Sequence, residues 1–427
     1  MAKTIYPFKR KPIWCNLLTS TVGILLLFSS SFAWGHSFQG LIYGTITLKD
    51  GGTKTGIIQW QNRQLFWEDI FVSIRKDNPS LTFLKSSEIK KLSDDEKKEK
   101  IEWGFMQIWE NKYPSRTNRF SCRFGDIATI TTKEGKKAEL RLKNGSSIAV
   151  EGSDKFRDIG SNLHLADPSG KWQRIGWSKV SKIEFTATPS HALSTAVRPL
   201  FGTVKSKYGT LTGYIKWDQD ETMTSTKLDG KDQEKTHKIP FWQINHILKK
   251  DDNSSEVTLR SGSKLLLWGT DDVGSSNHGL TIFSRNMGAI KVKWKDFIEL
   301  ELSHKAYTSQ LYGYRDFRPS TKLMATVTTL TGSRYQGRIV YDLDEQWNSD
   351  ILEGYKNGLN YLIPFGNIRT VERKNEKQSL ISLRNGAKVL LGGQNDVNDK
   401  NWGLLIWNDQ EKPKYVPWNQ VKTVQFK

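Results

Sequence analysis

The chain repeats itself without a gap over much of its length. Between Ile215 and Leu302 each position has a counterpart 124 positions later, so that Ile215 matches Ile339 and Trp294 matches Trp418. A fixed period of this kind constrains the fold before any single residue is interpreted, because each copy must build the same local structure. The sequence therefore predicts tandem structural repeats.

Each repeat is itself doubled. In the last repeat, Ile363-Pro364-Phe365 and Val416-Pro417-Trp418 begin two similar segments whose aromatic residues are 53 positions apart. The same spacing separates Phe241 from Trp294, and Phe124 from Trp177. The chain thus holds six related units, an A unit and a B unit in each of three repeats. Because units this small bury little apolar area alone, we expect each A unit to pack on its B partner.

The periodicity also sets the domain boundaries. We expect repeat 1 at 37–186, repeat 2 at 197–304 and repeat 3 at 319–427. The start of repeat 1 matches repeat 3 at an offset of 281 and its end at 241, which implies an insertion of about 40 residues within 68–120. Inside it we expect one amphipathic helix, because a capping-box pattern precedes apolar residues at helical spacing. The capping box is Ser93-Asp94-Asp95-Glu96, and the apolar residues are Ile101, Phe105, Ile108 and Trp109.

Short alternating segments separated by Gly, Asn and Asp predict an all-β chain. The closing pattern of each unit, a β-branched residue, Pro, an aromatic residue and then two aliphatic residues three apart, resembles the end of a small SH3-like barrel. There, a one-turn 3₁₀ connection precedes a short last strand. The opening pattern, Val327 through Gly332 and Gly337 to Asp342, is similar to the first motif of Sm-like barrels.

This resemblance implies six small SH3/Sm-like barrel units arranged as three paired repeats. The repeats also resemble tandem modules of secreted bacterial proteins that have no assigned activity. The Arg-Gly that helps Sm proteins hold RNA is absent where Ile363-Pro364-Phe365 stands, so RNA binding is not implied.

Residues 1–36 have the layout of a secretory signal peptide. A basic start is followed by an apolar stretch from Leu17 to Phe28 and by small residues that place cleavage near Ala33. An uncleaved membrane anchor is the alternative, but serines and threonines dilute the apolar run below the ~20 residues that a span needs. We expect an exported protein, in the periplasm or outside the cell, with no later transmembrane span. Its one remaining cysteine, Cys122, is expected to be a buried, inert thiol.

The formal net charge is +19, of which four positive charges lie in the leader, leaving +15 for the exported chain. A basic surface attracts polyanions. Outside the membrane these are anionic glycans, so nucleic acid is not the expected partner. A merely solvated surface is the alternative, because the lysines are spread through all repeats.

Sixteen tryptophans suggest stacking on sugar rings. However, the repeated ones, such as Trp60 after Ile58, share a strand face with an aliphatic residue two positions away. We therefore expect them in the core. The better ligand candidates lie outside the repeat pattern: Trp242, Trp347, Trp402 and Trp407.

Acidic loops suggest a Ca²⁺ site, since Ca²⁺ prefers carboxylate and amide oxygens. The same residues also make turns by accepting hydrogen bonds from their own backbone. Repeat 1 has Ser153, Asp154, Lys155 and Phe156 in the corresponding loop, which favours turns. The candidate ligands are Asp271, Asp272, Asp396, Asn398 and Asp399.

No motif for catalysis is present. The seven histidines occupy no equivalent repeat positions and none has the spacing of a metal motif. The sequence predicts an exported, non-catalytic repeat protein of the bacterial envelope that binds or scaffolds an anionic glycan or a protein. One alternative is an envelope enzyme that acts on polysaccharide through its acidic loops. The other is a protein that binds polyanions by charge alone.

Overall fold

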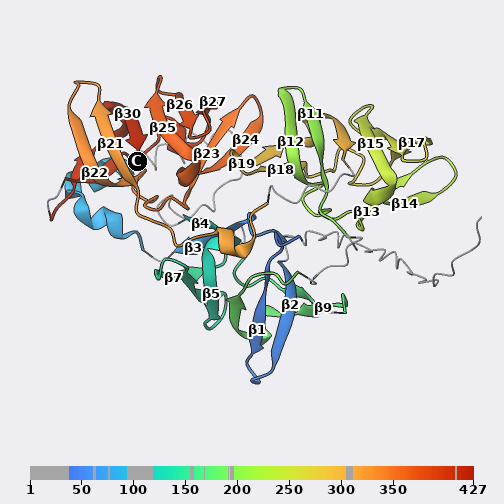
Figure 1. Ribbon diagram of the computed structural model, residues 1–427. Helices are drawn as coiled ribbons and strands as arrows, with labels where there is room; N and C mark the ends of the chain where they lie inside the picture. Colours follow the sequence, from blue (N-terminus) through green and yellow to red (C-terminus); the bar gives the residue numbers. More distant parts are fainter. Residues whose placement is uncertain are drawn as a thin grey trace, which may run out of the picture. The chain divides into compact units, whose positions relative to one another are not determined.

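The computed structural model describes residues 38–60, 64–75, 77–93, 119–153, 158–167, 169–190, 192, 197–303, 311–408 and 411–427. Residues 36–427 form one compact unit. Thirty strands, all paired antiparallel, dominate the described residues (Figure 1). The all-β prediction is confirmed. No helix among the described residues is long and apolar enough to cross a membrane.

Repeat 1 forms a sheet of ten strands in the order β4-β3-β7-β6-β5-β10-β1-β2-β8-β9. The strands are β1 (Tyr43–Leu48), β2 (Thr53–Trp60), β3 (Ile70–Arg75), β4 (Arg119–Arg123), β5 (Ile127–Thr132), β6 (Lys137–Leu142), β7 (Ser147–Glu151), β8 (Leu163–Ala166), β9 (Trp172–Ile175) and β10 (Val180–Phe185).

Repeats 2 and 3 together form a second sheet of twenty strands, in which the pairings of repeat 1 occur twice. In repeat 2 the strands are β11 (Phe201–Ser206), β12 (Gly209–Lys216), β13 (Lys227–Lys231), β14 (Thr236–Pro240), β15 (Ile244–Lys249), β16 (Ser254–Leu259), β17 (Lys264–Trp268), β18 (Leu280–Ser284), β19 (Gly288–Val292) and β20 (Phe297–Leu302). In repeat 3 they are β21 (Met324–Thr329), β22 (Arg334–Tyr341), β23 (Ile351–Lys356), β24 (Leu359–Pro364), β25 (Ile368–Arg373), β26 (Gln378–Leu383), β27 (Lys388–Gly392), β28 (Leu404–Trp407), β29 (Lys414–Val416) and β30 (Val421–Phe426).

The A and B units of a repeat exchange strands. In repeat 2, β12 of the A unit pairs with β18 of the B unit, and β17 of the B unit pairs with β13 of the A unit. Five-stranded sets therefore form across the two units: β13 to β17 make one set, and β11, β12 and β18 to β20 make the other. The pair of β15 with β20 joins the sets. We expected each unit to fold by itself and pack on its partner, but the two are interlocked. Closure of a set into a barrel stays a prediction.

A glycine in the second strand of each repeat makes this exchange possible. A Cβ at Gly213 would lie 2.3 Å from the carbonyl oxygen of Phe283 on β18, and one at Gly337 would lie 1.9 Å from that of Trp407 on β28. Real Cβ atoms do not come so near, so the position requires glycine. The repeated glycines thus mark where the A unit crosses the B unit.

Six 3₁₀ turns stand where the closing pattern predicted them, each before the last strand of an A or B unit. The aromatic residue that opens each turn is buried, which confirms that these repeated aromatics belong to the core. The turns are η3 (Phe124–Asp126), η4 (Trp177–Lys179), η5 (Phe241–Gln243), η6 (Trp294–Asp296), η8 (Phe365–Asn367) and η10 (Trp418–Gln420).

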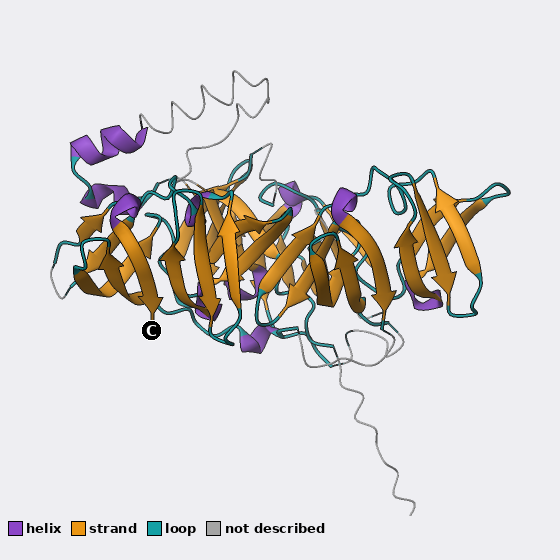
Figure 2. Cartoon of the chain, turned by 90° about the horizontal axis from the view of Figure 1, so that it is seen from above, coloured by secondary structure: helices purple, strands orange, loops and turns teal. Residues whose placement is uncertain are grey.

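The insertion of repeat 1 lies between β3 and β4, which pair with each other like β23 and β24. It is narrower than the predicted 68–120, because β3 was counted within it. A 3₁₀ turn, η1 (Pro79–Phe83), precedes helical residues 86–93 (Figure 2). The Lys85 backbone N–H, just before the helix, donates to Glu88 Oε2 at 2.7 Å, and Ser93, predicted to begin the helix, is instead its last described residue. Ile101, Phe105, Ile108 and Trp109 lie outside the described residues.

The start of this insertion packs against repeat 3. Leu84 joins Val340, Leu343 and Leu405 in one buried cluster. Asn78 Nδ2 also donates to the Leu343 carbonyl at 3.0 Å. The insertion therefore ties repeat 1 to the second strand of repeat 3.

Candidate functional site

One hydrogen-bonding arrangement, here called the aspartate device, occurs in all three repeats. The aromatic residue at or just after the end of the second strand donates its N–H or O–H to the carbonyl of a loop aspartate. The carboxylate of that aspartate accepts the backbone N–H of the third residue of the following strand. Aromatic residue, aspartate and strand residue are Trp60, Asp158 and Val72 in repeat 1, Trp217, Asp272 and Asp229 in repeat 2, and Tyr341, Asp396 and Glu353 in repeat 3.

The loop of repeat 1 therefore keeps its acid. The sequence placed Asp154 and its neighbours there and indicated that the acid was lost, but Asp158 performs the role from a position three residues later in a loop of the same length. The interpretation of these acids as makers of turns fits this geometry. Asp218 and Asp342 have the same character, because each sits at positive φ and accepts the backbone N–H of the opposite loop, from His278 and Trp402.

One neighbour of the loop aspartate differs between repeats. In repeat 1, Gln64 Nε2 donates to Asp158 Oδ1 at 2.9 Å. The equivalent residue in repeat 2 is Glu221, which with Asp218 and Asp272 offers three carboxylate oxygens within 4.8 Å of one another. Burial raises the pKa of Asp272 to about 7, and nearby Asp218 adds to the effect. An amide donor has thus been replaced by a third acid.

The five residues predicted to bind Ca²⁺ are not brought together. Asp272 joins Asp218 and Glu221, while Asp271 is exposed. Asp396 serves the aspartate device in repeat 3, where burial raises its pKa to about 8. Asn398 Oδ1 accepts the Lys400 N–H at 2.9 Å in a turn, and the Asp399 N–H donates to the Glu376 carbonyl at 2.6 Å. Of the five, only Asp272 belongs to a group with the oxygen spacing of a cation site.

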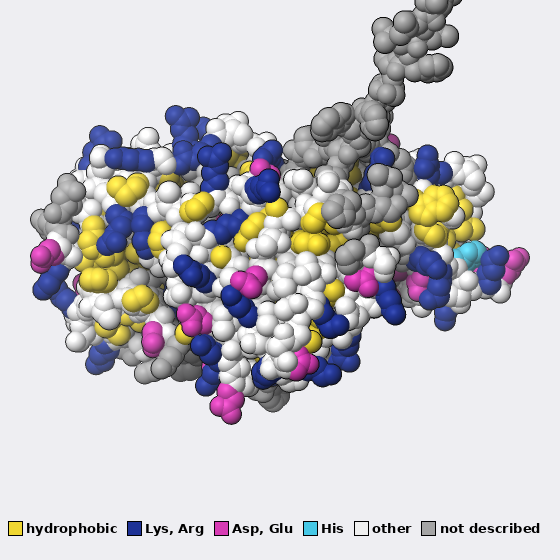
Figure 3. Space-filling view, turned by 60° about the horizontal axis from the view of Figure 1, so that its bottom comes forward, with side chains coloured by type: hydrophobic (Ala, Val, Ile, Leu, Met, Phe, Trp, Pro, Cys, Tyr) yellow, Lys and Arg dark blue, Asp and Glu magenta, His cyan; other side chains and the backbone are white. Residues whose placement is uncertain are grey.

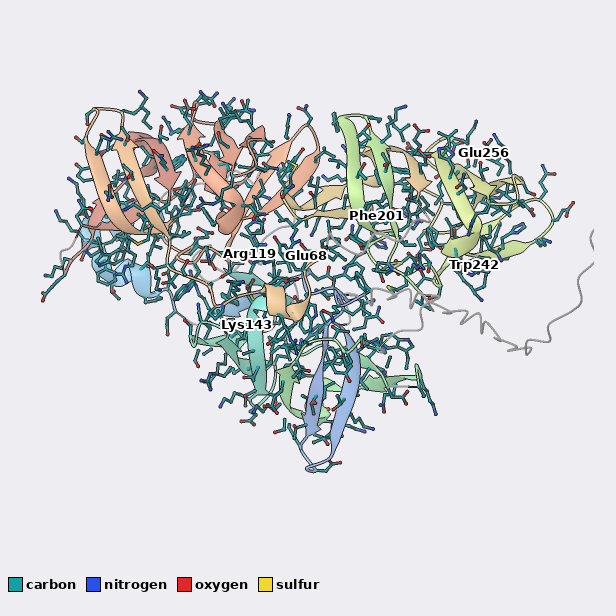
Figure 4. The ribbon with its side chains drawn as sticks, viewed as in Figure 1. Glu68, Arg119, Lys143, Phe201, Trp242 and Glu256 are labelled. Atoms are coloured by element: carbon teal, nitrogen blue, oxygen red, sulfur yellow. The ribbon has the colours of Figure 1, made fainter. Side chains whose placement is uncertain are left out.

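The four candidate tryptophans lie in three different surroundings. Trp242 is half exposed at the outer edge of repeat 2, away from repeat 3 (Figure 4). Trp347 lies beneath Lys322, whose Nζ is 3.6 Å from the ring centre. Trp402 and Trp407 pack against the cluster that receives the insertion. No two of them build a shared surface with the geometry of a sugar platform among the described contacts.

An open groove of ≈ 880 Å³ lies in repeat 3, at the end of β23 and β27 and beside the turn between β25 and β26. Its lining combines an aromatic ring, a guanidinium, an ammonium, two amides, one carboxylate and two glycines. These are Tyr355, Arg373, Lys377, Asn375, Gln378, Glu376, Gly392 and Gly393.

The groove arises from departures from the repeat. Gly392, which pairs with Tyr355 across β23 and β27, stands where repeat 2 has Trp268 paired with Lys231. The large indole of repeat 2 is thus absent from repeat 3. The only sequence signal for the groove was the change from Trp268 to Gly392 within an otherwise matching register. Residues shared between the repeats do not reveal it.

Two buried donors of repeat 3, Arg373 Nε in the groove and Trp418 Nε1, have no hydrogen-bond partner among the described residues. In repeats 1 and 2 the equivalent indole N–H donates to a carbonyl of the neighbouring turn, from Trp177 to Gly135 and from Trp294 to Asp252. In repeat 3 the corresponding carbonyl, that of Glu376, accepts the Asp399 N–H instead. An unpaired buried donor costs free energy unless an acceptor reaches it.

Buried charge is strongly one-sided. Among the described residues eight acidic side chains are buried but only one basic one, Lys216. The exposed side chains are therefore more basic than composition indicates, and Lys and Arg are more numerous than Asp and Glu on the face in Figure 3. The buried acids are Glu68, Asp69, Asp126, Asp158, Asp218, Asp272, Asp296 and Glu353.

Several of these acids lie where repeat 1 contacts the other two. Lys216 of repeat 2 pairs with Asp69 at 2.5 Å, and Arg119 pairs with Glu353 of repeat 3 at 2.5 Å. Glu68 (labelled in Figure 4) lies with Arg123 and Arg285 around one small cavity, and burial raises its pKa to about 8 against the opposing effect of these two cations. Cys122, on β4, is buried as predicted, and burial raises the pKa of its thiol.

No protein-family model matches the chain, and no curated protein shows significant similarity to it.

Proposed function

We propose that this is an exported, non-catalytic repeat protein of the bacterial envelope that binds an anionic glycan. The observation that carries the proposal is the one-sided burial of charge, eight acids against one lysine among the described residues. Acids that hold turns and repeat contacts are withdrawn from the surface, and the basic side chains that remain exposed attract a polyanion.

The alternative of an enzyme rests on the carboxylates of repeat 2. Asp218, Glu221 and Asp272 converge from the A and B units, and burial raises the pKa of Asp272, as a general acid would require. However, Asp272 is only 4% exposed and its carboxylate is bound to the Asp229 N–H. None of the three lines the groove of repeat 3. We therefore propose a structural role for this cluster.

The test is binding of residues 37–427 to immobilised polygalacturonate, with neutral dextran as the matched control. We expect retention on the acidic polymer alone, and weaker retention as salt rises from 0.05 to 0.3 M, because salt screens exposed charges. No retention on polygalacturonate at low salt, or equal retention on dextran, would contradict the proposal. Release of oligosaccharides during the incubation would favour the enzyme instead.

A further inference from the structure

We propose that the groove of repeat 3 is a binding site for a carboxylated sugar unit. The proposal rests on the function proposed above and names the ligand class and its location. Its basis is the groove lining and the difference from repeat 2, where Trp268 stands at the position of Gly392.

Tyr355 provides an aromatic face for a pyranose ring. It lies on β23 opposite Gly392, and a Cβ at Gly393 would lie 3.3 Å from its Cδ2. The two glycines thus leave the ring without a neighbouring side chain on this side. In repeat 2 the same three positions hold Lys231, Trp268 and Gly269, so the indole takes up the space that the groove offers in repeat 3.

Arg373 provides the cation. Its Nε is buried and has no hydrogen-bond partner among the described residues, and a guanidinium binds a carboxylate through two parallel hydrogen bonds. The equivalent residue of repeat 2, Lys249, is already engaged, because its Nζ donates to the Trp294 carbonyl at 3.1 Å and pairs with Asp252 at 2.7 Å. In repeat 2 the ammonium of Lys249 is therefore engaged within the fold, whereas in repeat 3 the guanidinium of Arg373 remains for a ligand.

The rest of the lining selects a sugar acid over a denser polyanion. Asn375 and Gln378 bring amide donors and acceptors, and Glu376 brings an acceptor, as the hydroxyl groups of a sugar require. The Glu376 carboxylate also repels a phosphate with more than one negative charge. A volume of ≈ 880 Å³ lies within the range of small-molecule sites, roughly 300–1,000 Å³.

The experiment is calorimetric titration of residues 37–427 with trigalacturonic acid, with neutral maltotriose and inorganic phosphate as comparison ligands. We expect binding of the acidic trisaccharide only. Arg373→Lys, which introduces the repeat 2 residue and keeps the charge, should weaken binding about tenfold because the two-bonded geometry is lost. Tyr355→Leu should weaken it by a similar factor. Gly392→Trp should abolish it by refilling the groove.

Arg369→Lys is the matched control, because Arg369 is exposed on the same strand and does not line the groove. Its affinity should equal that of the native chain. A side chain at position 392 also crowds the Lys377 carbonyl oxygen, which lies 2.6 Å from the Cβ position. The melting temperature of the Gly392→Trp variant is therefore measured alongside. If this variant does not fold, the Arg373 and Tyr355 variants decide the test.

The outcomes separate the two proposals. If Arg373→Lys and Tyr355→Leu bind the trisaccharide like the native chain, the groove is not the site, although the polymer-binding function stands. If the native chain is retained on polygalacturonate but binds no trisaccharide, the groove inference also fails. If it binds neither, both proposals fail. Equal binding of phosphate would show that charge alone is recognised.

Discussion

At the scale of single residues, position 64 and its counterparts 221 and 345 show how one functional group changes a buried environment. Gln64 donates to Asp158 and completes the hydrogen bonding of its carboxylate. Glu221 and Glu345 have no amide to donate. In repeat 3, Asp344 and Glu345 hydrogen-bond to each other, and burial raises the pKa of both. The repeats thus contain their own comparison between a satisfied and a strained carboxylate.

Replacing Glu221 by glutamine should stabilise the protein, most clearly above pH 7. Asp272 binds its proton more tightly folded than unfolded, since its pKa is raised from 3.8 to about 7. Its contribution to stability is fully present below pH 4 and is lost as the pH rises through 7. Glu221→Gln supplies the donor found in repeat 1, so we expect about 1 kcal/mol more stability at pH 8 and a weaker pH dependence. Urea unfolding at pH 5 and pH 8 measures both, and an unchanged or lower stability at pH 8 would contradict the assignment.

Much at this scale could be predicted. A spacing of two residues between Ile58 and Trp60 was enough to place the tryptophan in the core, because alternate residues of a strand share a face. The role of Asp158 could not be predicted, since it lies three residues later in its loop than the register places its counterparts Asp272 and Asp396. The role of Arg373 was also not predicted, because it depends on which neighbouring groups accept hydrogen bonds from its guanidinium.

At the scale of elements, the exchange of strands between A and B units is the main feature that the sequence did not reveal. Both units carry the same alternating pattern, so the second strand of one fits the third strand of either. What the pattern did predict was the all-β character of the chain and the 3₁₀ turn that closes each unit. The glycine of the second strand is a local trace of the exchange, but its reason appears only when Gly213 is seen against the Phe283 carbonyl.

The joint between repeats 2 and 3 depends on Gly288. β19 pairs with β24, and a Cβ at Gly288 would lie 2.2 Å from the Leu362 carbonyl oxygen. Its counterpart in repeat 3 is Lys412, which precedes β29. The residue at this position therefore differs between the two repeats.

Gly288→Ala should therefore destabilise the chain by about 3 kcal/mol, from the left-handed backbone and from the clash across the joint. Gly262→Ala is the control, because Gly262 has a similar φ of +90° but no atom within 4 Å of the Cβ position, and it should cost only about 1 kcal/mol. The difference in free energy of unfolding measures the joint. Equal losses would show that the contact contributes nothing.

At the scale of the whole molecule, repeat 1 is held to the others by contacts that no repeat pattern encodes. One apolar cluster contains residues of all three repeats, including Phe66, Phe201 and Leu362. Beside it lies the pair of Lys216 with Asp69, both 4% exposed. The register shows which residues repeat, but such contacts depend on how repeats meet, so the sequence left them open.

Lys216→Met should cost about 3–5 kcal/mol, because Asp69 would remain buried and lose its cation. The double variant Lys216→Met with Asp69→Asn should recover part of that loss, since the amide oxygen still accepts the Leu65 and Phe66 N–H groups that Asp69 holds now. Guanidinium unfolding of the single and double variants provides the comparison. A double variant no more stable than the single one would show that the buried charge is not the cause.

The molecule as a whole thus uses its repeats as a scaffold, while a departure in repeat 3 provides the groove. The most direct measurement is a crystal structure of residues 37–427 grown with trigalacturonic acid. We expect a sugar ring against Tyr355 with its carboxylate on Arg373. Sugar density at another place on the chain, with this groove holding only solvent, would contradict it.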